Sequence, residues 1–172
     1  MSFTKTFSKG QYAENAVCKW FNTCGIKAQL NTDKATNLLW DIECELNNKS
    51  FTCECKFDEM SQRTGNLAIE FFNSKLTKAS GIDVTKADLW IHCLQDGGNL
   101  TMWVCSVTDL KQFLQTHTPA RTIIDGGDKN ACLYLYPEST MLKVLLKRID
   151  NLSAEQVKTV IKGMLHVNRK TK

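Results

Sequence analysis

The chain has 172 residues, of which 42% are hydrophobic and 23% are charged, and this is the size and composition of one globular domain spanning residues 1–172. It contains no run of about eighteen apolar residues, and it begins without the apolar stretch of a signal peptide. We therefore expect a cytoplasmic protein with no membrane span.

Basic residues are concentrated near the C-terminus. The net charge is +4, but residues 143–172 hold eight basic residues against two acidic ones, so that the preceding part is slightly acidic. This asymmetry favours a phosphate-binding end, with Lys158, Lys162, Arg169 and Lys170 as candidate nucleic-acid contacts. A solvated helix face followed by a frayed terminus would explain the charge equally well, and that alternative stays open.

Eight cysteines are present, and no two of them form a C-x-x-C pair. Most have apolar neighbours at strand-like spacing, which favours buried free thiols that act as small hydrophobic side chains. A structural zinc or a disulfide framework is the alternative, with Cys53 and Cys55 as the best zinc candidates. The histidines His92, His117 and His166 form no metal-binding pattern, and we expect them to be structural.

The hydrophobic pattern predicts the following elements in chain order. A first helix begins near Ser8, which forms a capping box with Gln11, and it ends at Gly25. Strands are expected at residues 26–30, 38–46, 50–57, 66–72, 87–94, 101–105 and 132–136, and further helices at about residues 108–115 and 153–166. The strand at 87–94 is apolar on both faces, as an interior strand is. This order predicts a mixed α/β fold.

The second and third strands alternate strictly between polar and apolar residues. Their polar faces carry Asp41, Glu43 and Glu45 on the second strand, and Thr52, Glu54 and Lys56 on the third. The apolar faces carry Trp40, Ile42, Cys44 and Leu46 on the second, and Phe51, Cys53, Cys55 and Phe57 on the third. The two cysteines of the third strand therefore share the core face with phenylalanines, which argues against zinc there.

The turn between these strands sets their register. Asn47 and Asn48 suit a two-residue type I′ turn, which would place Asp41 opposite Glu54. A four-residue loop would instead pair Glu43 with Glu54.

Two carboxylates that face each other across a hairpin repel unless a cation lies between them. Oxygen ligands favour Mg²⁺ or Mn²⁺ over zinc, and Lys56 on the same face could orient an attacking water or stabilise charge on a phosphate. We expect this polar face of the sheet to be partly exposed. The alternative is an exposed sheet face that merely carries charges.

These residues resemble the motif of the PD-(D/E)xK nuclease superfamily over residues 8–95. The parts of the motif correspond to Glu14 on the first helix, Asp41 on the first hairpin strand, and Glu54-Cys55-Lys56 on the second. The proline of the motif is absent, because Trp40 precedes Asp41. The resemblance implies a restriction-endonuclease-like core, in which a central mixed sheet is flanked by helices.

A second stretch is similar to a subgroup of this superfamily that is common in phages. It runs from residues 63–70 through Ser80-Gly81-Ile82 to Thr85-Lys86-Ala87-Asp88. The subgroup includes Holliday-junction-resolvase-like proteins and homing endonucleases.

The resemblance also implies roles for individual residues. Asp41, Glu54 and the backbone carbonyl of Cys55 would bind Mg²⁺, for which Mn²⁺ would substitute. Lys56 would position or activate the nucleophilic water. Glu14 would complete the catalytic site through water or a second metal, unless it is a plain helix-surface residue.

Two further residues have alternative roles under the same resemblance. Glu70 would either join the site or form a surface salt bridge. Lys86 would either contact the scissile phosphate or cap a strand.

The implied activity is Mg²⁺-dependent hydrolysis of DNA phosphodiester bonds that leaves a 5′-phosphate. The favoured protein is a phage site-specific endonuclease of the homing type, acting on double-stranded or branched DNA in the cytosol of the host cell. Since cutting two strands is simplest with two sites, a homodimer or higher oligomer is expected. The alternatives are a Holliday junction resolvase and a non-catalytic nucleic-acid-binding module, and the complete set of Asp41, Glu54 and Lys56 weighs against the last.

Overall fold

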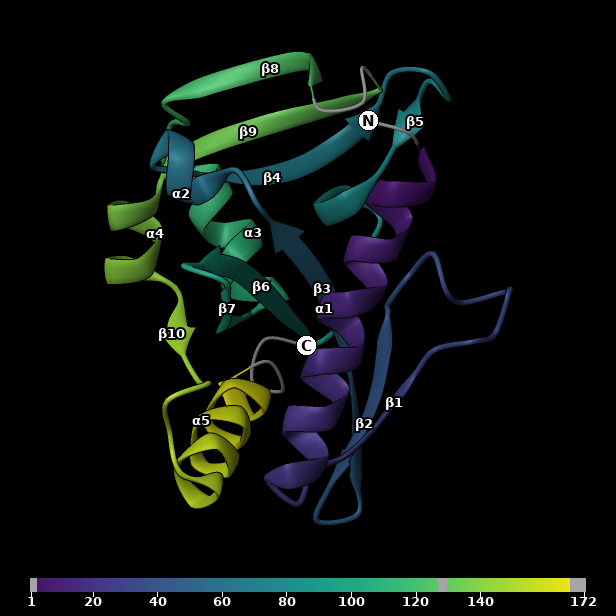
Figure 1. The fold of residues 1–172 in the computed structure, drawn as a ribbon, viewed down its shortest axis with the longest axis vertical. Coiled ribbons are helices and arrows are strands. Elements are labelled where there is room, and N and C mark those ends of the chain that lie inside the picture. Colours follow the sequence, from purple (N-terminus) through teal and green to yellow (C-terminus); the bar gives the residue numbers. More distant parts are fainter. Residues whose placement is uncertain (1–2, 127–129, 168–172) are drawn as a thin grey trace.

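The structure is a computed structural model that describes residues 3–126 and 130–167, with the backbone alone at residues 3–8, 96, 126 and 167. Its centre is a six-stranded sheet with the order β1-β2-β3-β6-β7-β10. Helices lie on both faces of this sheet, and the predicted mixed α/β fold with a flanked mixed sheet is therefore confirmed (Figure 1). No helix within the described residues is long and apolar enough to cross a membrane.

The six strands are β1 (Lys27–Leu30), β2 (Ile42–Leu46), β3 (Lys49–Asp58), β6 (Leu89–Asp96), β7 (Asn99–Ser106) and β10 (Lys147–Arg148). Strands β3 and β6 pair in parallel, and the other neighbours pair antiparallel. Residues 89–94 of β6 are buried without exception, as the apolar pattern on both faces predicted.

The hairpin between β2 and β3 has the predicted two-residue turn. Leu46 pairs with Lys49, and Asn47 and Asn48 have positive φ angles of 53° and 58°, as a type I′ turn requires. The expected strand at 38–46 is shorter than predicted, because β2 begins only at Ile42. Residues 38–41 approach the hairpin as a turn and a bend, and Asp41 therefore lies just before the strand.

A second sheet was not predicted. It has four antiparallel strands in the order β5 (Lys78–Ala79), β4 (Asn66–Asn73), β9 (Ala131–Pro137) and β8 (Arg121–Gly126). The sequence predicted β4 and β9 but not their pairing, and it did not predict β8. Strand β8 lies at an edge with most of its side chains exposed, so it lacks the alternation that marks a half-buried strand.

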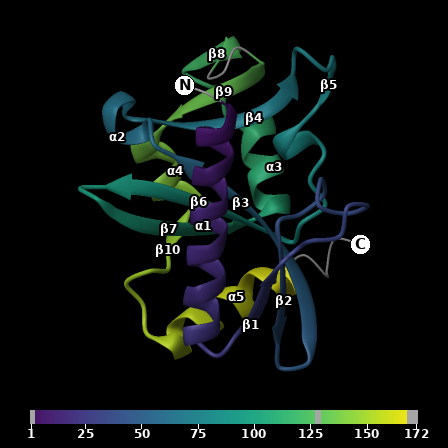
Figure 2. The ribbon, with the colours of Figure 1, turned by 45° about the vertical axis from the view of Figure 1, so that its right-hand side comes forward.

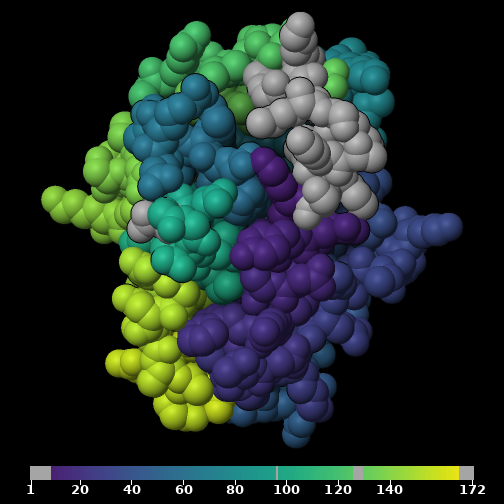
Figure 3. All heavy atoms as spheres, viewed as in Figure 1, coloured from purple at the N-terminus to yellow at the C-terminus, as the bar shows by residue number. Residues whose placement is uncertain are grey.

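Helices α1 (Phe3–Thr23) and α5 (Ala154–Val167) cover one face of the six-stranded sheet. Figure 3 shows α1 across this side of the molecule, with α5 beside its C-terminal part. Helix α1 begins at Phe3, so the prediction of a start at Ser8 is wrong: no proline or glycine separates the two positions, and a capping preference alone does not end a helix. Gly25, with φ of 76°, follows the helix as predicted.

The opposite face packs against α3 (Val107–Thr116), α4 (Glu138–Val144) and the second sheet. The short helices α2 (Ser61–Thr64) and η1 (Gly81–Asp83) connect β3 to β4 and β5 to β6. Figure 2 shows α3 between the second sheet and strands β6 and β7. This side has its own hydrophobic cluster, centred on Trp90, Leu110, Phe113 and Met141.

All eight cysteines are buried and free, as expected for small apolar side chains. Cys53 and Cys55 lie in the cluster beneath α1 with Phe51 and Phe57. Their predicted orientation toward the core is confirmed.

Candidate active site

Asp41 lies where β3 loses its antiparallel neighbour. Strand β2 pairs with β3 only as far as Ile42 and Cys53, and beyond that point the only strand paired with β3 in the described chain is β6. At this open edge the Cys55 N–H donates a hydrogen bond of 2.8 Å to Asp41 Oδ2. Since the N–H and C=O of one strand residue point to the same side, the Cys55 carbonyl also faces the edge at which Asp41 lies.

Glu54 is adjacent to this edge and is held by two polar neighbours. Lys56 Nζ lies 2.6 Å from its Oε1 atom. The Thr85 hydroxyl lies 3.1 Å from Oε2 and 2.9 Å from the Leu39 carbonyl, and can donate its one proton to either. Glu54 is only 6% exposed, so the expectation of a partly exposed polar face is wrong at this residue. The turn that carries Thr85 and the side chain of Trp90, from the parallel neighbour β6, enclose it.

Glu14 and Glu70 reach the same cluster from other elements. Glu14 on α1 is close enough for the charges of Lys56 and Glu54 to act on its carboxyl group. Glu70 on β4 helps to raise the pKa of Lys56. It forms no ion pair within the described residues, and its Oε1 atom accepts a hydrogen bond of 2.6 Å from Ser80 Oγ. The structure therefore places both glutamates around the pair of Glu54 and Lys56.

The carboxyl groups of this cluster share an unusual electrostatic state. Burial raises the pKa of Asp41, Glu54 and Glu14, and Lys56 offsets that rise only in part. Mutual repulsion adds to it, because Asp41 raises the pKa of Glu54 and Glu14 raises that of Asp41. Neighbouring carboxyl groups whose pKa values are raised by burial and mutual repulsion are typical of a functional site, such as one that binds a cation.

Asp58, four residues further along β3 than Glu54, shows the opposite behaviour. Burial alone would raise the pKa of Asp58, but hydrogen bonds from His92 and from the Ala68 and Met60 N–H groups lower it below its ordinary value. Its charge is thus satisfied by the protein itself, as in a structural carboxylate. The contrast sets Asp41, Glu54 and Glu14 apart as the candidates for function.

Lys56 is charged at neutral pH. Burial opposes its charge, but Glu54 and Asp41 outweigh this effect and hold the pKa of Lys56 well above its usual range. Its ammonium group lies 5.9 Å from the centre of the Trp90 ring, within the range of a cation–π contact.

Trp90 is a residue beside the site that the sequence did not reveal, and His92 next to it bonds Asp58, in line with its predicted structural role. Both are fully buried, and they flank Glu54 and Lys56 on the parallel neighbour β6. The Trp90 Nε1–H donates to His92 Nδ1 at 3.2 Å, so that the His92 Nε2–H faces Asp58. Their position depends on the parallel pairing of β3 with β6, for which the local pattern gave no signal.

Several residues of the second sequence stretch, between Ser80 and Asp88, make contacts near the site. Gly81 has φ of 52°, and a Cβ atom there would overlap the carbonyl oxygen of Glu70. Asp88 Oδ2 accepts a hydrogen bond of 2.9 Å from the Thr52 N–H. Thr85 contacts Glu54 on β3, and Ser80 bonds Glu70 on β4. The segment from 80 to 88 therefore connects β3 and β4 around the site.

The donor set at the open edge is made of oxygen atoms. No three His, Cys, Asp or Glu side chains within the described residues gather as a ready metal site. The oxygen donors at or beside this edge are the carboxylates of Asp41 and Glu54, which already have the polar neighbours described above, and the backbone carbonyl of Cys55. These fit a hard divalent cation that keeps several waters, such as Mg²⁺.

The candidate nucleic-acid contacts are dispersed. Lys86 and Lys162 line one groove, while Lys158 donates to Glu155 at 2.8 Å on α5. Lys86 does not cap a strand through its side chain, which is exposed; its N–H bonds the Leu39 carbonyl. Arg169 and Lys170 lie outside the described residues.

The fold that carries this cluster is one that a nuclease also has. No protein-family model matches the chain, and no curated protein matches it. Among solved structures, the chain is similar to a bacterial homing endonuclease, I-Ssp6803I, with a TM-score of 0.52 and 12% identity. The similarity covers 98% of this chain and 97% of that one, so it extends through both sheets. At this level of identity the comparison concerns the fold.

Proposed function

We propose that this protein is a metal-dependent DNA endonuclease of the PD-(D/E)xK superfamily that cuts at a specific site, as a homing endonuclease does. The observation that supports the proposal is the position of Asp41 on the Cys55 N–H, beside the ion pair of Glu54 and Lys56, with electrostatic interaction among all three. The similarity of the whole fold to a homing endonuclease supports it. As cutting both strands is simplest with two sites, the active form would be a homodimer or a higher oligomer.

Asp41, Glu54 and the Cys55 carbonyl would hold Mg²⁺, and Mn²⁺ would substitute for it. When bound, the ion would neutralise charge on the phosphate and lower the pKa of a coordinated water. The raised pKa values of Asp41 and Glu54 fit this assignment, because a cation would relieve the repulsion between the two carboxylates. Glu14 would bind through a water molecule at the same site.

Lys56 would position or activate the nucleophilic water, as a hydrogen-bond donor and a positive charge. The neighbouring carboxylates keep it protonated, so that its ammonium group can orient the attacking water and stabilise charge on the phosphate oxygens. Water would add to the phosphorus as the P–O3′ bond breaks, leaving a 5′-phosphate and a 3′-hydroxyl group.

The direct test is cleavage of supercoiled plasmid, linear duplex and four-way-junction DNA with Mg²⁺, with Mn²⁺ and with EDTA. We expect cleavage of duplex DNA that requires a divalent ion. Asp41→Asn should abolish it and Mn²⁺ should restore part of it, while Lys56→Ala should lower the rate by orders of magnitude and still bind Mn²⁺. Glu43→Gln is the matched control, because Glu43 lies two residues from Asp41, on β2, and accepts a hydrogen bond from Gln29 instead of facing the site.

Three outcomes would change the proposal. Cleavage of four-way junctions alone would identify a junction resolvase. DNA binding without cleavage under any divalent ion would favour the non-catalytic module. Equal loss of activity in Glu43→Gln and Asp41→Asn would show that the whole strand, and not the open edge, is responsible.

A further inference from the structure

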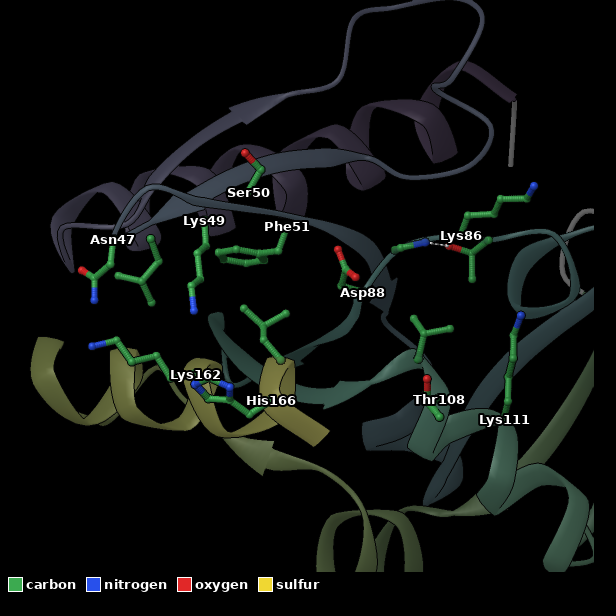
Figure 4. Close-up of a pocket in the computed structure, with 15 residues that line it drawn as sticks. Asn47, Lys49, Ser50, Phe51, Lys86, Asp88, Thr108, Lys111, Lys162 and His166 are labelled. Atoms are coloured by element: carbon green, nitrogen blue, oxygen red, sulfur yellow. Dashed lines mark hydrogen bonds between the residues drawn. The ribbon is translucent and has the colours of Figure 1, made fainter. Parts of the chain in front are cut away.

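A groove of about 830 Å³ opens next to the candidate active site. Its walls come from four segments distant in sequence: the β2–β3 hairpin, the turn before β6, the start of α3 and the end of α5. Figure 4 shows Lys49 from the hairpin and Lys162 from α5 pointing into the space between these elements at one end. Lys86 and Lys111 lie at the other end.

The groove carries a net positive charge that the protein does not neutralise. None of Lys49, Lys86, Lys111 and Lys162 forms an ion pair with another described residue. The acidic residue of the lining, Asp88, is already bonded to the N–H and hydroxyl groups of Thr52. The lysines therefore face solvent with their charge available to a ligand.

The groove adjoins the candidate active site through one residue. Thr85 lines the groove, and its hydroxyl contacts Glu54 Oε2. Lys86, the next residue, also belongs to the lining, and its side chain is exposed and points outward at that end of the groove (Figure 4). A strand that leaves the open edge of β3 past Thr85 would thus enter between the two pairs of lysines.

We propose that this groove binds the backbone phosphates of DNA on one side of the scissile phosphate, with Lys49 and Lys111 as contacts in addition to Lys86 and Lys162. The proposal rests on the proposed function for its position beside the site, but its ligand chemistry follows from the groove itself. Lysines at both ends of the groove suit a ligand that carries several phosphates along its length, as a DNA strand does. Apolar lining residues such as Phe51, Val107 and Leu165 offer surface to deoxyribose between the phosphates.

The test measures binding of a fluorescent DNA duplex in EDTA, where cleavage cannot occur, over a series of salt concentrations. The variant is Lys49→Gln with Lys111→Gln. Each phosphate contact contributes about 0.9 to the slope of log K against log salt, so the double variant should lose about 2 in slope and bind at least about tenfold more weakly at low salt. The control is Lys27→Gln with Lys143→Gln, which removes the same charge from positions outside the groove.

The outcomes separate the groove from the proposed function. If the parent protein binds duplex DNA through Lys49 and Lys111 but cuts no DNA, the groove proposal is supported and the nuclease proposal is refuted. A parent that cuts DNA, with equal slopes for the groove and control variants, would refute the groove. Displacement of the duplex by millimolar inorganic phosphate, to the same extent from the parent and the groove variant, would also refute it. So would binding of anionic lipid vesicles in place of DNA. Lys49→Gln alone, at an exposed hairpin position, gives the same test if the double variant does not fold, with an expected slope change of about 1.

Discussion

Two kinds of buried or half-buried carboxyl group lie on and around β3. Asp58 has four donors and a lowered pKa, whereas Asp41, Glu54 and Glu14 have raised pKa values. The first arrangement stabilises the fold at neutral pH, and the second lowers its stability there. This difference gives predictions of opposite sign for single residues.

Glu14→Gln should raise the stability of the cation-free protein at neutral pH. The folded state holds the proton of Glu14 more tightly than the unfolded state does, because burial raises the pKa. Stability from this group is therefore lost as pH rises from the ordinary carboxyl pKa through the raised one. Glutamine removes that loss, so thermal unfolding in EDTA should show a gain of roughly 1–3 °C at pH 7 that shrinks near pH 4. A gain independent of pH would contradict the electrostatic cause.

Asp58→Asn should lower stability at neutral pH by about 1–3 kcal/mol, since an amide replaces a charged acceptor of buried hydrogen bonds. The pKa of Asp58 is lowered in the folded state, so its contribution is present above the ordinary aspartate pKa and is lost as pH falls through the lowered one. Urea unfolding of parent and variant should therefore converge on acidification. Glu59→Gln, at the neighbouring exposed position, is the control and should change little.

At the scale of elements, the segment from Ser80 to Asp88 determines how β4 lies against β3. Ser80 bonds Glu70, Thr85 contacts Glu54 and Asp88 bonds Thr52. Gly81 permits the close approach, because its backbone lies against the Glu70 carbonyl with no room for a side chain. The position of Glu70 near Lys56 thus depends on one glycine.

Gly81→Ala should be much more harmful than Gly97→Ala. Both glycines have φ of 52°, but a Cβ atom at Gly97 would meet nothing within 4 Å. The positive φ alone costs about 1 kcal/mol, so Gly97→Ala measures that strain and Gly81→Ala adds the overlap with Glu70. We expect denaturant unfolding to show a loss of roughly 1 kcal/mol for Gly97→Ala and at least about 3 kcal/mol for Gly81→Ala. Similar losses would mean that β4 can move away from the turn.

At the scale of the whole molecule, cation binding should be coupled to folding. An ion that binds the folded protein alone raises its unfolding temperature, and protons on Asp41 and Glu54 compete with it. The stabilisation by Mg²⁺ should therefore be larger at pH 8 than at pH 5.5, as measured by thermal unfolding without DNA. Asp41→Asn should lose most of it, whereas Glu43→Gln should keep it. Equal stabilisation of both variants would place the ion elsewhere.

The sequence by itself determined the hairpin between β2 and β3. Strict alternation decides which side of a strand each residue faces, and the Asn47-Asn48 turn decides the register. Both signals are local, and the register they predicted is the one observed from Ile42 to Leu46. The prediction that Trp40 shares the apolar face of Ile42 is wrong, because Trp40 precedes the strand and packs against the hydrophobic cluster on the other side of the sheet. The sequence did not show that β2 begins only at Ile42, because residues 38–41 have an apolar pattern that also suits a strand.

The tertiary structure alone decided what surrounds those residues. The parallel pairing of β3 with β6 puts Trp90 and His92 beside Lys56, and the second sheet brings Glu70 to it. The basic groove joins segments that are up to about a hundred residues apart in the chain. Side-chain periodicity states which face of an element is buried but not which distant element covers it. The burial of Glu54, the raised pKa values around it and the groove beside it all depend on which distant elements pack against β3.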